Sequence, residues 1–316
     1  MNMQIVKSDV LLFITALIWG FAFVAQRVGM DYVGPFTFNG VRFALGALFL
    51  LPLIAFRSRS ASGRAASRAN RRKIVLGGLL AGFVLFAGAS LQQVGLVYTT
   101  AGNAGFITGL YVVIVPILSV FLGQRTDTGT WVGAVLAVAG LYLLCATGGV
   151  TVSAGDILVL AGAFFWAGHV LVIGWLSPKM DSFGLAFCQY VACAALSLVV
   201  GVFTEIITLD ALVRGAAPIL YGGVMSVGIA YTLQVVGQKH APGSHAAILM
   251  SLEAVFAAVG GWLLLGERLT SRQYLGCSLM LTGMLVSQLW QVCFMGKAAE
   301  ECDDSGEKGF TASNRG

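Results

Sequence analysis

The sequence predicts an all-α integral membrane protein with ten transmembrane helices, arranged as two inverted five-helix repeats with both termini in the cytoplasm. Three observations carry this prediction: the composition, an internal repeat and the distribution of basic residues. Hydrophobic residues make up 58% of the 316 residues and charged residues only 10%, with a mean hydropathy of +0.86. A soluble domain carries about a quarter charged residues, because water must wet its surface. This chain therefore belongs in a bilayer, and its net charge of +5 indicates membrane topology rather than nucleic-acid binding.

The chain contains one hydrophobic unit twice. The stretch Gly102–Arg125 recurs as His245–Arg268, and an offset of 143 residues aligns their Leu-Gly-polar-Arg ends and places Gly140 on Gly283. Such self-similarity indicates a tandem repeat. The repeat divides the chain into a first five-helix unit over residues 1–150, a second over 151–295, and a polar tail over 296–316 that we expect to be disordered.

Ten segments are apolar and long enough to span a bilayer, which takes roughly 20 residues. They are residues 9–28, 35–56, 74–97, 102–122, 130–148, 156–176, 183–204, 216–237, 244–265 and 272–294. The links between them are short, except for a basic linker over residues 57–73 with seven Lys or Arg and no acid. The first segment resembles a signal peptide, but no A-x-A cleavage site follows it and the same unit recurs within the chain, so it reads as a spanning helix.

The basic residues predict the orientation. With the N-terminus in the cytoplasm and alternating sides, fourteen Lys or Arg lie on the cytoplasmic side and four lie on the other side. This asymmetry follows the positive-inside rule. Five spans per repeat is an odd number, so the second copy must enter the membrane from the opposite face. Inverted repeats are typical of secondary transporters, whose substrate site lies near the midplane between the halves.

Two tryptophans occupy equivalent places in the two repeats. An offset of 147 places Asp9 on Asp156 and Trp19 on Trp166. Each tryptophan lies ten residues into its span, about 15 Å deep, which is half of a hydrocarbon core of about 30 Å. Because the repeats enter from opposite faces, both tryptophans should reach the midplane, where they either pack against other helices or line a cavity.

The paired units and their Leu-Gly-[Glu/Gln]-Arg boundaries resemble the drug/metabolite transporter superfamily, specifically its EamA-type, ten-helix branch. The resemblance rests on Pro116–Arg125 (PILSVFLGQR) and Glu253–Arg268 (EAVFAAVGGWLLLGER), together with the run Thr99–Pro116, and it covers roughly residues 9–294. Two positions depart from the family pattern: Ala254 replaces a proline and Gln124 replaces a glutamate. The resemblance implies transport of small polar metabolites such as amino acids and their derivatives.

Arg42 and Glu253 are the fully charged side chains that lie well inside predicted spans. An ionisable group at such depth costs about 2.5–3.5 kcal/mol on insertion scales and usually faces the bundle interior. Their repeat mates, Gln189 and Leu110, are uncharged, so the charges are not a symmetric feature of the scaffold. The two side chains either form a structural ion pair or line a cavity, where they bind the charged ends of a substrate.

Further candidates are polar side chains in apolar surroundings. His169 follows Trp166 by three residues and serves either packing or proton transfer. Buried amides need partners, which a water-filled cavity would supply; the candidates are Asn39, Gln92, Gln93, Asn103, Gln189 and Gln234. His240 and His245 flank a Pro-Gly turn and read as interfacial. No spacing of His or Cys residues indicates a metal site.

Two other features read as structural. Gly102, Gly105 and Gly109 form a small-residue face, which favours close approach of a neighbouring helix. Asp9 and Asp156 open their spans, where an acid suits the positive end of the helix dipole. We therefore assign neither aspartate a transport role.

The sequence thus favours a secondary exporter of small organic metabolites, such as amino acids or their derivatives, in the inner membrane of a bacterium. No catalytic motif is present, and we expect no enzyme activity, cofactor or metal. The expected partners are a small-molecule substrate and the lipid bilayer, with a homodimer as an open alternative to a monomer, and no nucleic acid. Two other function classes stay open: a membrane-embedded enzyme acting on a lipid-borne substrate through Glu253 and His169, and a non-transporting scaffold.

Overall fold

A computed structural model of the chain describes residues 3–58, 61–99, 101–123, 126–145, 153–265 and 270–290, which form helices joined by turns and short connections. The first half contains α1 (Met3–Gly29), α2 (Pro35–Ser58), α3 (Ala61–Tyr98), α4 (Ala101–Gly109), α5 (Tyr111–Phe121) and α6 (Thr128–Cys145). The second half contains α7 (Ala154–Leu176), the short 3-10 helix η1 (Ser177–Lys179), α8 (Ser182–Thr204), α9 (Leu209–Arg214), α10 (Ala216–Leu220), the π-helix η2 (Tyr221–Tyr231), α11 (Thr232–Gly237), α12 (Gly243–Met250), α13 (Glu253–Leu265) and α14 (Ser271–Trp290).

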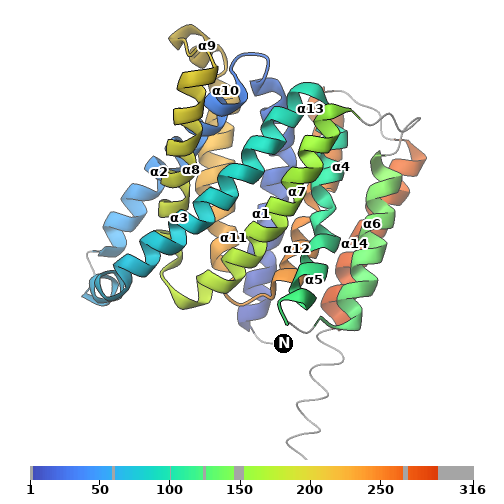
Figure 1. Ribbon diagram of the computed structural model, residues 1–316. Helices are drawn as coiled ribbons and strands as arrows, with labels where there is room; N and C mark the ends of the chain where they lie inside the picture. The colour runs from blue at the N-terminus through green and yellow to red at the C-terminus, as the bar shows by residue number, and fades with distance from the viewer. Residues whose placement is uncertain are drawn as a thin grey trace, which may run out of the picture.

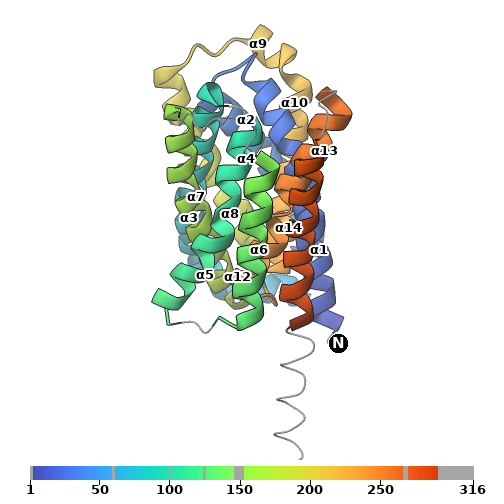
Figure 2. The ribbon, with the colours of Figure 1, turned by 90° about the vertical axis from the view of Figure 1, so that its right-hand side faces the viewer.

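The helices run side by side from one end of the molecule to the other, with the N-terminus at the lower end and α9 at the upper end in Figures 1 and 2. Seven helical stretches of the described chain are long and apolar enough to cross a membrane, and three shorter apolar helices accompany them. Large apolar side chains are widely exposed on the outer faces of these helices. The protein is therefore an all-helical, multi-pass membrane protein.

The basic segment predicted as a linker is largely helical. Helix α2 continues to Ser58, and α3 begins at Ala61, well before the first residue of the predicted span. The segment is rich in Ala and Arg, which are strong helix formers, so the helix extends beyond the apolar stretch. The tail over residues 296–316 lies outside the described residues, as do the Gln-Arg and Gly-Glu-Arg ends of the two repeated motifs.

Helices α6 and α14 pack against each other through glycines placed symmetrically in the two halves. A Cβ atom on Gly133 would lie 2.7 Å from the carbonyl oxygen of Gly283, and one on Gly140 would lie 2.6 Å from that of Gly276. The offset of 143 residues places Gly133 on Gly276 and Gly140 on Gly283, so the two contacts are repeat equivalents of each other. The two helices are antiparallel, and they lie side by side in both views (Figures 1 and 2). Their backbones can approach this closely only because no side chain intervenes.

Two predicted spans are interrupted at equivalent places. The span over 102–122 consists of α4 and α5, which are separated at Leu110, and the span over 244–265 consists of α12 and α13, separated at Ser251 and Leu252. The offset of 143 places Leu110 on Glu253, the first residue of α13. Interrupted helices at corresponding positions of the two halves are a mark of transporter binding sites. Hydropathy alone did not predict them, because the residues at both breaks remain apolar or small.

The expectation of close packing at Gly105 is wrong. Gly105 is buried, but a Cβ atom built on it would find no described atom within 4 Å, whereas one on Gly109 would lie 3.0 Å from the side chain of Leu141. The spacing of glycines predicts a face, but it does not reveal which member of that face meets a neighbouring helix.

We expect Gly105→Leu to leave thermal stability in detergent nearly unchanged, because the new side chain enters open space. Gly133→Leu should lower stability by about 1–3 kcal/mol, the usual cost of overpacking, because it separates α6 from α14. Melting curves of the two purified variants check this prediction. An equal loss of stability in both would contradict it.

Candidate functional site

A small internal cavity lies between the two halves, at the level of the helix interruptions. Its volume is about 30 Å³, room for a few water molecules. The lining includes seven of the candidates named from the sequence: Trp19, Arg42, Gln92, Trp166, His169, Gln234 and Glu253. The remaining lining residues are Phe23, Gln26, Thr108, Tyr111, Val170, Ser226, Tyr231 and Met250.

Arg42 of α2 reaches the cavity as a buried cation that lacks a carboxylate partner among the described residues. The side chain is 1% exposed. Its Nε donates a hydrogen bond of 3.0 Å to Oδ1 of Asn39, and its guanidinium lies over the rings of Phe38 and Phe43, at 5.5 and 5.0 Å from their centroids. These contacts orient the guanidinium but do not neutralise it. A buried cation that is held in place and not neutralised is suited to binding an anion from the cavity.

Glu253 supplies an acidic side chain to the same cavity. It is 4% exposed and belongs to the first turn of α13, where the backbone meets α1: a Cβ atom on Gly20 would lie 2.7 Å from the Glu253 carbonyl oxygen. Tyr111, the first residue of α5, lines the same cavity, and its buried hydroxyl makes no hydrogen bond within the described part of the chain. The structural ion pair considered from the sequence is not formed, because no salt bridge joins Glu253 to Arg42 where both are described.

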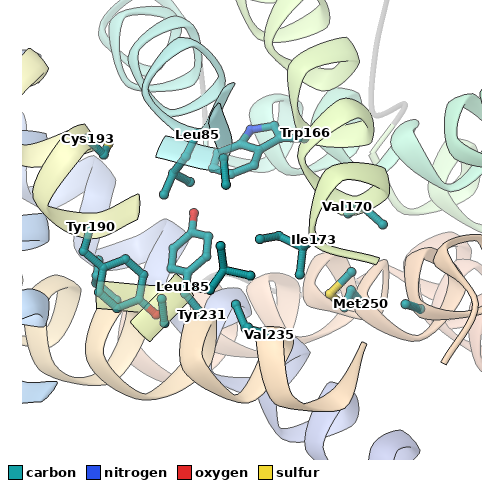
Figure 3. Packing of buried hydrophobic residues seen from close by; sticks show 14 of the residues in the cluster. Leu85, Trp166, Val170, Ile173, Leu185, Tyr190, Cys193, Tyr231, Val235 and Met250 are labelled. Carbon is teal, nitrogen blue, oxygen red and sulfur yellow. The ribbon is translucent and has the colours of Figure 1, made fainter. Parts of the chain in front are cut away.

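Aromatic rings make up part of the same cavity lining as Arg42 and Glu253. The ring of Tyr231 lies 4.5 Å from that of Trp19 and 6.2 Å from that of Trp166, centroid to centroid. Tyr190 and Phe43 pack behind it, at 6.3 and 5.8 Å. Figure 3 shows Tyr231 in the middle of this group, with Tyr190 on one side and Trp166 on the other. Because Tyr231 fills the centre, the cavity is nearly closed in this conformation.

Tyr231 ends the π-helix η2, and first-half side chains bond to the backbone of that segment. Nε1 of Trp19 donates to the carbonyl oxygen of Ser226 at 3.3 Å, and Oγ1 of Thr15 donates to that of Ala230 at 3.2 Å. A π-helix displaces carbonyl groups from their usual partners and is frequent at functional sites. Helix α1 therefore holds, through two side-chain hydrogen bonds, the backbone of the segment that positions Tyr231.

A network of amides lines the side of the cavity formed by α1, α3, α4 and α7. Oε1 of Gln92 accepts hydrogen bonds from Nε1 of Trp166 at 2.8 Å and from Oγ1 of Thr108 at 3.3 Å. Nε2 of Gln92 donates to Oε1 of Gln26 at 3.1 Å. The network fixes the orientation of the Trp166 ring and presents a polar wall to the cavity.

Three predicted site residues lie behind the lining. Asn39 accepts the hydrogen bond from Arg42 that is described above. Oε1 of Gln189 lies 2.9 Å from Nε2 of His169. Gln93 donates to the carbonyl oxygen of Gln26 at 3.3 Å. These three amides support lining residues and do not face the cavity. In the sequence they cannot be told apart from Gln234, which does line it.

Sequence reasoning missed Tyr111 and Tyr231, since a tyrosine in an apolar helix is unremarkable by itself. The repeat contained a signal for Tyr111, which directly follows the position equivalent to Glu253. No pattern indicated Tyr231, because its role depends on four helices that converge on it. Within the described residues no group of three or more His, Cys, Asp or Glu side chains is placed to hold a metal ion.

Known proteins resemble this chain over almost its whole length. A family model described as the EamA-like transporter family matches residues 6–146 and 153–288. The chain belongs to the EamA-like transporter family. Its two matched regions correspond to two EamA repeats, and the family is a branch of the drug/metabolite transporter superfamily.

Relatives of this EamA protein carry transporter names. An uncharacterized transporter from Archaeoglobus fulgidus is 34% identical over 290 residues, covering 89% of this chain and 86% of that protein. The uncharacterized inner membrane transporter YedA from Escherichia coli is 23% identical over 302 residues, with 90% and 92% coverage. A solved crystal structure superposes with a TM-score of 0.72 at 19% identity, covering 89% of this chain and 96% of that one, which shows the same fold. This EamA protein is thus a membrane transporter.

Proposed function

We propose that this protein is a secondary exporter of amino acids or closely related zwitterions, working by alternating access around the central cavity. The observation that carries the proposal is a pair of buried ionisable side chains, Arg42 and Glu253, which line one aromatic cavity and form no salt bridge with each other. An Arg guanidinium matches a carboxylate, and a buried carboxylate matches an ammonium group. The rings of Trp19, Trp166 and Tyr231 suit an apolar or aromatic side group.

The size of the cavity supports a mechanism in which the site opens and closes. A volume of about 30 Å³ is far below the few hundred Å³ of a typical metabolite site. A second pocket of about 300 Å³ lies at the end of the bundle where α1 begins, lined among others by Lys7, Arg57 and Lys239. In the proposed topology this end is cytoplasmic, so the second pocket is an entrance for substrates that leave the cell.

The proposed topology has ten spans in two inverted repeats with both termini cytoplasmic, in the inner membrane of the cell. The antiparallel, symmetric packing of α6 on α14 supports the inversion, since equivalent helices of inverted repeats run in opposite directions. The excess of basic residues at one end supports the orientation.

Solute counterflow in proteoliposomes tests the proposed function. Vesicles loaded with one unlabelled amino acid should accumulate the same labelled amino acid transiently, and a panel of amino acids, simple carboxylates and simple amines should rank zwitterions first. Absence of counterflow for every amino acid, with counterflow for another class on the panel, would reject the substrate assignment and leave the transporter assignment intact.

Cysteine labelling tests the orientation. A cysteine introduced at Arg64, in the basic start of α3, should react with a membrane-impermeant reagent only from the cytoplasmic side. Labelling of intact cells from outside would reverse the topology and the direction assigned to the entrance pocket.

A further inference from the structure

Asp9 and His245 form a buried pair that joins the two halves at the lower end of the molecule. Nε2 of His245 lies 2.9 Å from Oδ1 of Asp9, and the two side chains are 3% and 19% exposed. The prediction that Asp9 opens its helix is wrong, because helix α1 begins at Met3 and Asp9 lies inside it. His245, which the sequence predicted as interfacial, is buried within the protein.

The upper end carries an equivalent pair. Oγ1 of Thr99 donates a hydrogen bond of 2.6 Å to Oδ1 of Asp156, which is the repeat mate of Asp9. Thr99 lies three residues before Gly102, the repeat mate of His245. Each aspartate in the first long helix of one half therefore bonds the other half near the start of its fourth predicted span. Figure 1 shows that α1 begins at the lower end and α7 at the upper end, so the two pairs lie at opposite ends.

We propose that Asp9 and His245 form a proton-binding site that latches the inner end of the transporter, whereas Asp156 and Thr99 form its proton-insensitive counterpart at the outer end. The proposal rests on the proposed function, which requires the two ends to open in turn. The nearly closed central cavity fits a state with both latches engaged.

The chemistry of the inner pair carries the proposal. With Asp9 ionised, Nε2 of His245 must carry the hydrogen of the shared bond, which leaves Nδ1 as an acceptor. That Nδ1 atom is buried and makes no hydrogen bond within the described residues, so it is available for an incoming proton. Protonation gives an imidazolium–carboxylate pair, which binds more strongly than the neutral imidazole does. Acid on the inner side should therefore hold the inner latch closed. The outer pair has the Thr99 hydroxyl in place of the imidazole, so acid should not strengthen its bond to Asp156.

The surroundings leave His245 as the ionisable side chain that is bonded to Asp9 among the described residues. The elements packed against α12 carry Lys7 on α1, Asp127 before α6 and Lys179 after α7, while His240 precedes α12 itself. None of these forms an ion pair with Asp9 or His245 where the chain is described. Histidine is the side chain that ordinarily titrates between pH 5 and 8, whereas lysine and aspartate keep their charge across that range.

Accessibility of the central cavity from the cytoplasmic side tests the proposal. The reporter is Met250→Cys, at a residue that lines the cavity, in a background with the six native cysteines replaced. An impermeant thiol reagent is applied to inside-out vesicles at pH 6 and pH 8, with His245 or with His245→Gln. Glutamine keeps a donor for Asp9 but does not titrate. The ratio of the two labelling rates at each pH cancels the pH dependence of the thiol itself.

The labelling rate of the reporter with His245, divided by that of the reporter with His245→Gln, should fall several-fold from pH 8 to pH 6. Asp9→Asn, which keeps the hydrogen bond without the charge, should also flatten the response and serves if the glutamine variant does not fold. Asp156→Asn, the matched change at the outer end, should leave the response in place. An unchanged ratio, or equal loss of the response in the outer variant, would overturn the proposal. Because labelling needs no substrate, this result is independent of whether counterflow supports the proposed function.

Discussion

Replacing Arg42 with methionine is expected to lower exchange of carboxylate-bearing substrates at least tenfold while leaving thermal stability close to that of the wild type. Hydrogen bonds to charged groups contribute about 1.5–3 kcal/mol, and 1.4 kcal/mol corresponds to roughly a tenfold change in an equilibrium. Stability should hold because methionine fills much of the same volume and removes a buried cation. Isosteric apolar replacement of buried charges is often neutral or stabilising. Counterflow and melting curves measured on the same preparation check both parts.

Two controls sharpen this prediction. Arg42→Lys keeps the positive charge without the planar fork, so it should retain part of the exchange. Arg214→Met makes the same chemical change at an exposed residue that pairs with Asp210 and does not line the cavity, so it should change neither exchange nor thermal stability. A large fall in melting temperature with Arg42→Met, accompanied by a parallel loss of exchange, would show that Arg42 is a structural element of the core.

Replacing Glu253 with glutamine is expected to lower exchange of amine-bearing substrates at least tenfold and to spare carboxylates that lack an amine. The substitution keeps the shape of the side chain and removes the negative charge that faces the aromatic rings and Tyr111. A buried carboxylate that meets an ammonium group contributes a charge-assisted bond, which the neutral amide replaces with a weaker one. Counterflow with matched amino acids and des-amino acids measures the difference.

The opposite result also has a clear meaning. If Glu253→Gln leaves exchange of all substrates intact but removes the dependence of net transport on a proton gradient, Glu253 is the coupling group instead of the ammonium site. Asp210→Asn, an equivalent change at an exposed carboxylate, should leave both exchange and proton dependence unchanged. If Glu253→Gln behaves like this control, the proposed role of Glu253 is wrong.

The repeat in the sequence predicted more of the site than any single motif did. Trp19 and Trp166 were paired by an offset alone, and the structure brings both to one cavity. Arg42 and Glu253 were selected because a charge inside an apolar span is costly, and they too line that cavity. Hydropathy and repeat register fix the depth of these residues in the bilayer. Residues at one depth become neighbours in a bundle when the helix faces that carry them converge.

Other features of the site depended on which helix faces meet. Asn39, Gln93 and Gln189 have the same buried, amide character as Gln234, yet only Gln234 lines the cavity. The depth of a residue follows from its position along the helix, but the direction in which it faces depends on how the neighbouring helix is rotated. That rotation is set by packing, such as the glycine contacts of α6 with α14.

The sequence by itself determined that the chain is a membrane protein of two related helical units with polar groups buried between apolar faces. These properties follow from composition and periodicity, which are local. Only the tertiary structure decided that Asp9 meets His245 across 236 positions of sequence, that Tyr231 closes the cavity, and that Gly105 faces open space. Each of these depends on contact between helices far apart in the chain, and such contacts leave no mark in the local pattern of either partner.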